Sequence, residues 1–204
     1  MGRRNILFYG GAFDPPHLGH IRYFREAVRA VQPDLSLIVP SQVSPHKQAS
    51  RTPFALRAAM CRVFLTESGR VVISGIENTK NRKKSYSVKT LKRLRRRYPD
   101  AEIHMMIGSD MLLSFKSWYH WRRILSLCTL VVAVRDDADL AEAEASAEDL
   151  VSLGGKILWV RFEPLETSSS EIRRKLAEGD DYEGLLDPGT VRFIRAHGLY
   201  GVKR

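Results

Sequence analysis

Short apolar runs rich in β-branched residues alternate with helical patterns along most of this chain, and this alternation restricts its fold more than any other feature. The runs predict strands at Ile6–Tyr9, Leu35–Val39, Val71–Ile76, Ile103–Ile107, Thr129–Val134 and Ile157–Phe162. Nearly every position in these runs is apolar, which is typical of strands buried on both faces of a parallel sheet. We therefore predict an α/β fold with a doubly wound, Rossmann-like parallel sheet.

The segments between the strands carry apolar residues at helical spacing. One stripe, after the first strand, consists of Ile21, Phe24, Val28 and Val31. A second helix is predicted to begin with Thr52 as N-cap and Pro53 as first helical residue, with one face formed by Leu56, Met60, Val63 and Phe64. A third stripe consists of Val88, Leu91, Leu94 and Tyr98. The acidic, alanine-rich segment Asp136–Leu150 predicts a surface helix that follows a loop.

The pattern becomes purely helical after Phe162. Helices are predicted at Ser168–Glu178 and at Thr190–His197, the second of them closed by Gly198. At 204 residues the chain is long enough for one domain with a substantial core. We expect a single domain, with an α/β nucleotide-binding core at 1–165 and a C-terminal helical subdomain at 166–204.

Composition argues against several classes of protein. The longest strongly apolar run, Leu130–Val134, is far too short to span a bilayer. The only two cysteines, Cys61 and Cys128, lie far apart in sequence, which argues against a disulfide framework and against a cysteine-based zinc site. A cytoplasmic location follows as the default expectation.

The positive charge of the chain is concentrated in one segment. The net charge is +10, and the ten basic residues between Lys80 and Arg97, where no Asp or Glu occurs, account for all of it. The stripe of Val88, Leu91 and Leu94 indicates that this segment is an amphipathic helix with a solvated outer face. Attraction of anionic substrates or of a partner stays open, and a non-enzymatic protein that binds nucleic acid through residues 80–97 is the rival from another functional class.

The stretch Phe8–His20, FYGGAFDPPHLGH, combines glycines, prolines and histidines between a strand and a helix. Gly10 and Gly11 allow the backbone to turn tightly and to approach a ligand closely. His17 and His20 lie three residues apart, so both imidazoles project from one side of the first helical turn. A strand-to-helix turn of this kind lies at the carboxyl edge of a parallel sheet and favours phosphate. A glycine turn with two incidental surface histidines is the alternative.

Residues 10–20 resemble the H-x-G-H motif of the nucleotidyltransferase superfamily, and most closely that of bacterial nicotinate mononucleotide adenylyltransferases. The resemblance implies that His17 and His20 are catalytic. It assigns the main chain around the first turn to ATP, at Gly10, Gly11, Ala12 and Phe13, and it assigns Asp14 to the mononucleotide. Class I aminoacyl-tRNA synthetases share a related motif, but this chain is too short for one and has no K-M-S-K-S segment.

A second phosphate site is predicted where the helix at Ser168 begins. Ser168 and Glu171 have the spacing of a capping box, and several hydroxyls followed by an arginine also suit a polyphosphate. Residues 167–173 resemble the I-S-S-T-x-I-R motif of the same family, from which Thr167 and Ser170 depart. The resemblance assigns Ser168, Ser169 and Arg173 to the ATP phosphates.

Other family motifs follow in order along the chain. They comprise Pro45-His46-Lys47, which resembles P-P-H-K, Arg57 with Met60, Ser85-Tyr86-Ser87, which resembles S-Y-T, Gly108-Ser109-Asp110 with Trp118, which resembles G-x-D followed by a tryptophan, and the closing segment Val191–Tyr200. The resemblance assigns Gly108 and Asp110 to ATP, and it assigns His46, Lys47, Ser85, Tyr86, Ser87 and Trp118 to the mononucleotide. Asp110 could instead be a helix N-cap, Lys47 a solvated loop residue, and Trp118, like its neighbour Trp121, a core residue.

The reaction implied by the resemblance joins nicotinate mononucleotide to ATP, with Mg²⁺ bridging the ATP phosphates and held largely by substrate and water. We expect no resident metal site and no membrane or nucleic-acid partner, and the sequence leaves homo-oligomerisation open. Pantetheine-phosphate adenylyltransferase is the nearer rival, with the same ATP site and a different acceptor. Two departures from the family pattern, Lys89 in place of an acidic residue and Arg135-Asp136-Asp137 in place of Arg-Pro-Gly, lie near the predicted acceptor pocket.

Overall fold

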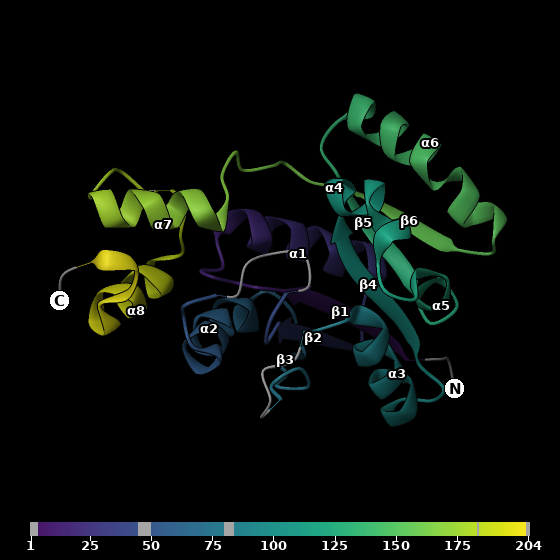
Figure 1. Cartoon of the computed structure of the whole chain (residues 1–204), viewed down its shortest axis with the longest axis horizontal. Helices are drawn as coiled ribbons and strands as arrows, with labels where there is room; N and C mark the ends of the chain where they lie inside the picture. The colour runs from purple at the N-terminus through teal and green to yellow at the C-terminus, as the bar shows by residue number, and fades with distance from the viewer. Residues whose placement is uncertain (1–3, 45–49, 80–83, 183, 203–204) are drawn as a thin grey trace.

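All six predicted strands are present, and they form one parallel sheet. The computed structural model describes residues 4–44, 50–79, 84–182 and 184–202. The strands are β1 (Asn5–Gly11), β2 (Leu35–Pro40), β3 (Val71–Ile73), β4 (Glu102–Gly108), β5 (Thr129–Val134) and β6 (Lys156–Arg161). Their order in the sheet is β3-β2-β1-β4-β5-β6 (Figure 1). This order confirms the predicted fold class, and it places the switch in winding direction between β1 and β4, where open α/β sheets bind ligands.

Helices cover both faces of the sheet (Figure 1). One face packs against α1 (Leu18–Val31) and the 3-10 helix η1 (Cys61–Thr66), which follows α2 (Phe54–Met60). The other face packs against the remaining helices of the core. These are α3 (Ser87–Arg97), α4 (Ser109–Leu113), η2 (Phe115–Ser117), α5 (Trp121–Leu125) and α6 (Asp137–Ser152). The four inner strands are therefore buried on both sides, as their apolar composition predicts.

The C-terminal residues form a separate small cluster of helices. It consists of α7 (Ser169–Glu178), α8 (Pro188–His197) and η3 (Leu199–Gly201), which Figure 1 shows together at one end of the molecule. Their apolar side chains, led by Ile172, Leu176 and Ile194, pack around Met60 from α2. Through this contact the C-terminal helices lie beside the carboxyl edge of the sheet. The division into parts 1–165 and 166–204 of one domain stays a prediction.

Several predicted boundaries are wrong by a few residues. The second helix begins at Phe54 with Pro53, not Thr52, as N-cap, because the Thr52 carbonyl accepts a hydrogen bond from Arg57 instead of starting the helical ladder. β3 ends at Ile73 rather than Ile76, since it is an edge strand with one neighbour and Gly75 follows. α8 begins two residues before Thr190, where the Asp187 carboxylate caps the helix ahead of Pro188.

The basic helix is amphipathic, as predicted. Val88, Leu91 and Leu94 of α3 are buried against the sheet, while most of the lysines and arginines of the helix are exposed. Arg95 alone among its last-turn arginines is half-buried, and it donates to the carbonyls of Leu127 and Ala101 at 2.9 and 2.6 Å. Among the described residues, no helix is both long and apolar enough to cross a membrane.

One half-buried histidine gives a testable dependence of stability on pH. His104 lies on β4, and neither of its ring nitrogens has a hydrogen-bond partner in the described part of the chain. Burial lowers the pKa of this imidazole, and the negative charge of Glu102 opposes that effect in part. Because the folded protein binds this proton more weakly than the unfolded chain, protonation favours unfolding, and stability falls as pH drops below about 6.5 towards the lower folded pKa.

Replacement of His104 by glutamine should flatten that dependence. Urea unfolding of the wild type and of His104→Gln at neutral and mildly acidic pH measures it, and the free energy of unfolding of the wild type should fall more steeply with acid. Equal slopes for the two proteins would contradict the assignment of this titration to His104.

Candidate active site

A single large cavity lies at the carboxyl edge of the sheet. Its volume is about 1420 Å³, and it extends from the turn after β1 to the beginning of α7. Every predicted site residue within the described part of the chain lines it: Gly10, Gly11, Ala12, Phe13, Asp14, His17, His20, Ser85, Tyr86, Ser87, Gly108, Asp110, Trp118, Ser168, Ser169 and Arg173. The predicted residues His46 and Lys47 lie outside the described residues. Motifs from the two ends of the chain, at residues 10–20 and 167–173, thus converge on one cavity.

The turn after β1 differs in detail from the expected glycine turn. Gly10 and Gly11 are the last two residues of the strand itself, and the left-handed residue is Phe13, with φ of 48°. Asp14 follows, joined to Pro15 by a cis peptide bond. The glycines therefore extend the strand to the edge of the cavity, and Phe13, which is buried, makes the turn.

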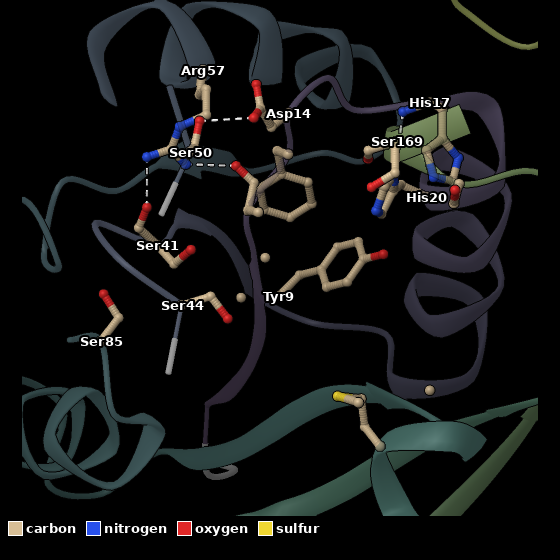
Figure 2. A pocket seen from close by; sticks show the side chains of 18 of the residues that line it. Tyr9, Asp14, His17, His20, Ser41, Ser44, Ser50, Arg57, Ser85 and Ser169 are labelled. Atoms are coloured by element: carbon tan, nitrogen blue, oxygen red, sulfur yellow. Dashed lines mark hydrogen bonds between the residues drawn. The ribbon is translucent and has the colours of Figure 1, made fainter. Parts of the chain in front are cut away.

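The two histidines of the motif face each other at the beginning of α1 (Figure 2). Their ring centroids are 3.7 Å apart, and the backbone amide of His17 donates to Nδ1 of His20 at 3.2 Å. Because Nδ1 of His20 accepts this bond, the neutral ring carries its proton on Nε2, which makes Nε2 a donor. A Cβ at position 19 would lie 3.1 Å from the His17 ring, so the glycine of the motif leaves room for that ring.

The beginning of α7 approaches the same turn from the other side. Ser169 Oγ donates to the carbonyl of Pro15 at 2.9 Å, and Arg173 Nη1 donates to the carbonyl of Asp14 at 2.8 Å. Ser168 is the N-cap, and its Oγ accepts from the amide of Glu171, as the capping pattern predicts. The two predicted phosphate sites therefore lie side by side on the wall of one cavity, where Figure 2 shows Ser169 beside His17 and His20.

Asp14 is held by hydroxyl groups from two distant segments. Its carboxylate is buried, and it accepts hydrogen bonds from Ser50 and from Tyr200, each at 2.7 Å. Sequence analysis assigns Asp14 to the mononucleotide, and that role stays a prediction. Neither Ser50 nor Tyr200 was expected to contact it, although Tyr200 closes a recognised motif.

Gly108 and Asp110 lie at the end of β4, across the switch point from the histidines. Gly108 is the N-cap of α4, so Asp110 is not the N-cap but an exposed residue of the first turn. A Cβ on Gly108 would lie 2.4 Å from Asp110 Oδ1, which explains why glycine and aspartate occur together at this spacing. The carboxylate is exposed on the cavity wall, where it can accept hydrogen bonds from a ligand.

A second end of the cavity is lined by aromatic rings and by the beginning of α3. Tyr86 is the N-cap of α3, and its carbonyl accepts from the amides of Lys89 and Thr90, so the first-turn amides without an acceptor inside the helix are those of Ser87 and Val88. Trp118 is half-buried, packs on Phe115 and also lines the cavity, and its assignment to the mononucleotide stays a prediction. Trp121 packs against the core. Tyr119, which sequence analysis missed, lies 4.8 Å from the Tyr86 ring and lines the cavity as well.

Two charged side chains to which sequence analysis gave no role in the site, Arg57 and Glu77, are buried at the cavity wall. Arg57 donates to the backbone carbonyls of Ala12, Ser41 and Thr52, two of which Figure 2 shows as dashed lines. Glu77 accepts from the Thr90 hydroxyl at 2.6 Å, and burial raises the pKa of its carboxyl group. Arg57 interrupts an otherwise apolar helix, which is a signal that sequence reasoning could have used; Glu77 lies in a polar loop that gives none.

Comparison with known proteins decides the family. Residues 8–175 match the model of the cytidylyltransferase-like family. The chain belongs to this family. A probable nicotinate-nucleotide adenylyltransferase from Shewanella sp. (strain MR-4) is 32% identical over 96% of this chain and 98% of its own length. A protein of the same description from Acidithiobacillus ferrooxidans is 34% identical over 96% and 95%. These relatives confirm the resemblance found in the motifs.

Solved structures of this family share the fold. The Plasmodium falciparum nicotinic acid mononucleotide adenylyltransferase complexed with NaAD superposes with a TM-score of 0.77 at 19% identity, over 98% of this chain and 99% of that one. Its complex with APC gives a TM-score of 0.75 at the same identity. The alignments cover the C-terminal helices as well as the sheet, so the arrangement that brings α7 to the cavity belongs to the shared architecture.

Proposed function

We propose that this protein is a nicotinate-nucleotide adenylyltransferase of NAD biosynthesis, which joins nicotinate mononucleotide and ATP to give deamido-NAD and pyrophosphate. The observation that carries the proposal is the pair of imidazoles at the beginning of α1, with Arg173 of α7 bonded to the turn before them in the same cavity. The full-length relatives described as nicotinate-nucleotide adenylyltransferases support the choice of acceptor.

The reaction needs charge stabilisation rather than a general base. The nucleophile is an oxygen of the mononucleotide phosphate, which is ionised at neutral pH; it attacks the α-phosphorus of ATP, and pyrophosphate leaves. His17 and His20 supply hydrogen-bond donors where negative charge grows, and the positive end of the α1 dipole adds to their effect. The remaining contribution is the alignment of the two nucleotides in one cavity.

The triphosphate is assigned to the wall formed by α7. Arg173 provides the positive charge, and the amides at the beginning of the helix suit the same oxygens, while Ser168 and Ser169 border the cavity there. Mg²⁺ enters with ATP as part of the substrate and neutralises phosphate charge. We expect phosphates and water to supply most of its ligands.

The remaining predicted site residues are assigned either to the adenosine of ATP or to the acceptor mononucleotide. Asp110 at the end of β4 can accept from ribose hydroxyls, beside the Gly108 backbone. Trp118 offers a face for the pyridine ring, and the amides at Ser87 suit the nicotinate carboxylate. Asp14, His46, Lys47, Ser85 and Tyr86 complete the predicted mononucleotide site. A cytoplasmic location stays a prediction.

A comparison of acceptors tests the proposal most directly. With ATP and Mg²⁺, pyrophosphate release should be fast with nicotinate mononucleotide, slower with nicotinamide mononucleotide and absent with phosphopantetheine. The acid is preferred because a carboxylate gains from the free amides and the helix dipole at the beginning of α3. Steady-state kcat/KM for each acceptor measures the preference.

The same assay separates the alternatives. Turnover with phosphopantetheine instead of nicotinate mononucleotide would replace the proposed acceptor and leave the ATP site unchanged. A higher kcat/KM for nicotinamide mononucleotide than for the acid would contradict the role of the α3 amides in recognising a carboxylate.

A further inference from the structure

The carboxylate of Asp14 is surrounded by three competing partners. Tyr200 Oη donates to Oδ1 and Ser50 Oγ donates to Oδ2, both at 2.7 Å. Arg173 Nη1 lies 4.0 Å from Oδ2, too far for a hydrogen bond, and donates to the backbone carbonyl of the same residue at 2.8 Å. Each hydroxyl therefore takes one acceptor position on an oxygen with which the guanidinium could otherwise form a direct pair, and so competes with the guanidinium for that oxygen.

The position of Arg173 depends on this arrangement. Asp14 is 6% exposed, so attraction between its charge and a nearby cation is only weakly screened by water. A bidentate pair of guanidinium and carboxylate is the strong form of this interaction. If Arg173 formed that pair, its positive charge would be neutralised, and less of it would act on a phosphate in the cavity.

Tyr200 is well placed to prevent such a pair. It follows α8 in the short helix η3, has a left-handed backbone with φ of 58°, and directs its hydroxyl to a residue 186 positions earlier. Burial, followed by the negative charge of Asp14, raises the pKa of the phenol. The hydroxyl therefore stays protonated and remains a donor to Oδ1 throughout the physiological range of pH.

We propose that Tyr200 is a positioning residue for ATP: by donating to Asp14, it competes with Arg173 for that carboxylate and keeps the guanidinium from forming a close bidentate pair, so that it can bind the triphosphate. The inference rests on the proposed function, which assigns Arg173 to ATP. Ser50 acts in the same way on the other carboxylate oxygen.

Binding of two adenine nucleotides to three variants tests this role. Tyr200→Phe should weaken binding of a non-hydrolysable methylene analogue of ATP, with Mg²⁺, by about five- to tenfold, because it removes one hydrogen bond from a buried charge. It should leave binding of AMP unchanged, since AMP lacks the β- and γ-phosphates. Tyr200→Phe with Asp14→Asn should bind the analogue as tightly as Asp14→Asn alone, because no carboxylate then competes for Arg173.

A matched control is available in the same group of helices. The Tyr182 hydroxyl accepts a hydrogen bond from exposed Arg195 at 2.8 Å, and Tyr182 does not line the cavity. Tyr182→Phe should therefore leave the affinity for the analogue unchanged. Isothermal titration calorimetry provides the dissociation constants, and thermal unfolding shows whether each variant is folded.

The outcomes distinguish this inference from the proposed function. Equal weakening of analogue and AMP in Tyr200→Phe would show a general structural role and overturn the inference. A double variant that binds the analogue no better than Tyr200→Phe would exclude Asp14 as the competitor and overturn it too. If the wild type bound no ATP analogue at all, the proposed ATP site would fail, and this inference with it.

Discussion

Replacement of His20 by alanine should lower kcat by a factor of about 10² to 10³, while KM for ATP changes little. In the proposed mechanism the His20 ring stabilises charge that develops at the α-phosphorus only in the transition state, and removal of one such donor has an effect of this size in other enzymes. His17 shares the position, with its ring centroid 3.7 Å from that of His20. The double variant His17→Ala with His20→Ala should show no measurable synthesis of deamido-NAD.

His197 provides the control for this experiment. It is an exposed histidine on α8 whose Nδ1 contacts the carbonyl of Phe193, and it does not line the cavity. His197→Ala should therefore retain the wild-type kcat. Synthesis at the wild-type rate by the double variant of His17 and His20 would contradict the mechanism, and a drop in its melting temperature matched by loss of secondary structure would assign the effect to folding.

The tautomer of His20 leads to a more specific prediction about substitutions at this position. Because Nδ1 accepts from the His17 amide, only Nε2 of a neutral ring can donate to a phosphate oxygen. Glutamine carries an amide that can both accept at the helix terminus and donate, so His20→Gln should keep more activity than His20→Ala. Equal kcat values for the two variants would show that a donor at this position is not what the reaction requires.

The sequence predicts the sheet well because its signal is local. Strands of a parallel sheet are apolar on both faces, so each appears as a continuous run whose limits can be read within about two residues. The main exception is β3, whose run continues to Ile76 although pairing stops at Ile73. As an edge strand, β3 pairs only with β2, and the length of that pairing determines where β3 ends. The sequence of β3 does not show how far the pairing extends.

The residues of the cavity could also be predicted, since they follow strands directly or begin helices. The contacts that these residues make with one another could not be predicted. Asp14 and Tyr200 are separated by 186 positions, and their hydrogen bond depends on how the C-terminal helices pack on Met60. The same holds for Tyr119, which joins the cavity wall because its ring packs beside that of Tyr86. Side-chain partners of this kind are determined by tertiary packing rather than by local pattern.

Arg57 is the clearest case of a contact that the sequence does not predict, because a charged side chain is normally exposed and this one is buried. It is only 2% exposed, and its guanidinium donates to three backbone carbonyls: Ala12 at 2.6 Å, Ser41 at 2.8 Å and Thr52 at 3.1 Å. These carbonyls belong to the turn after β1, to the end of β2 and to the segment before α2. One side chain thus joins three loops at the edge of the cavity.

Replacement of Arg57 by methionine should lower the free energy of unfolding by about 3–5 kcal/mol, because it keeps much of the apolar volume but leaves buried carbonyl groups without donors. That loss is a large share of the stability of an ordinary domain, about 5–15 kcal/mol. Urea unfolding monitored by circular dichroism measures it. Arg62→Met, at an exposed position of η1 a few residues later, should change stability by less than about 0.5 kcal/mol.

Arg57→Lys tests whether the positive charge of Arg57 is sufficient or whether the geometry of its guanidinium group is also required. Lysine keeps the positive charge, but its single ammonium group cannot match the fork that directs Nε, Nη1 and Nη2 to three different carbonyls. We expect a stability between those of the wild type and Arg57→Met, and a lower kcat even where the protein is fully folded, because the turn that carries His17 is held through the carbonyl of Ala12. If Arg57→Lys matched the wild type in both stability and kcat, a buried positive charge alone would be sufficient, and the three-way connection would not be what holds the catalytic turn in place.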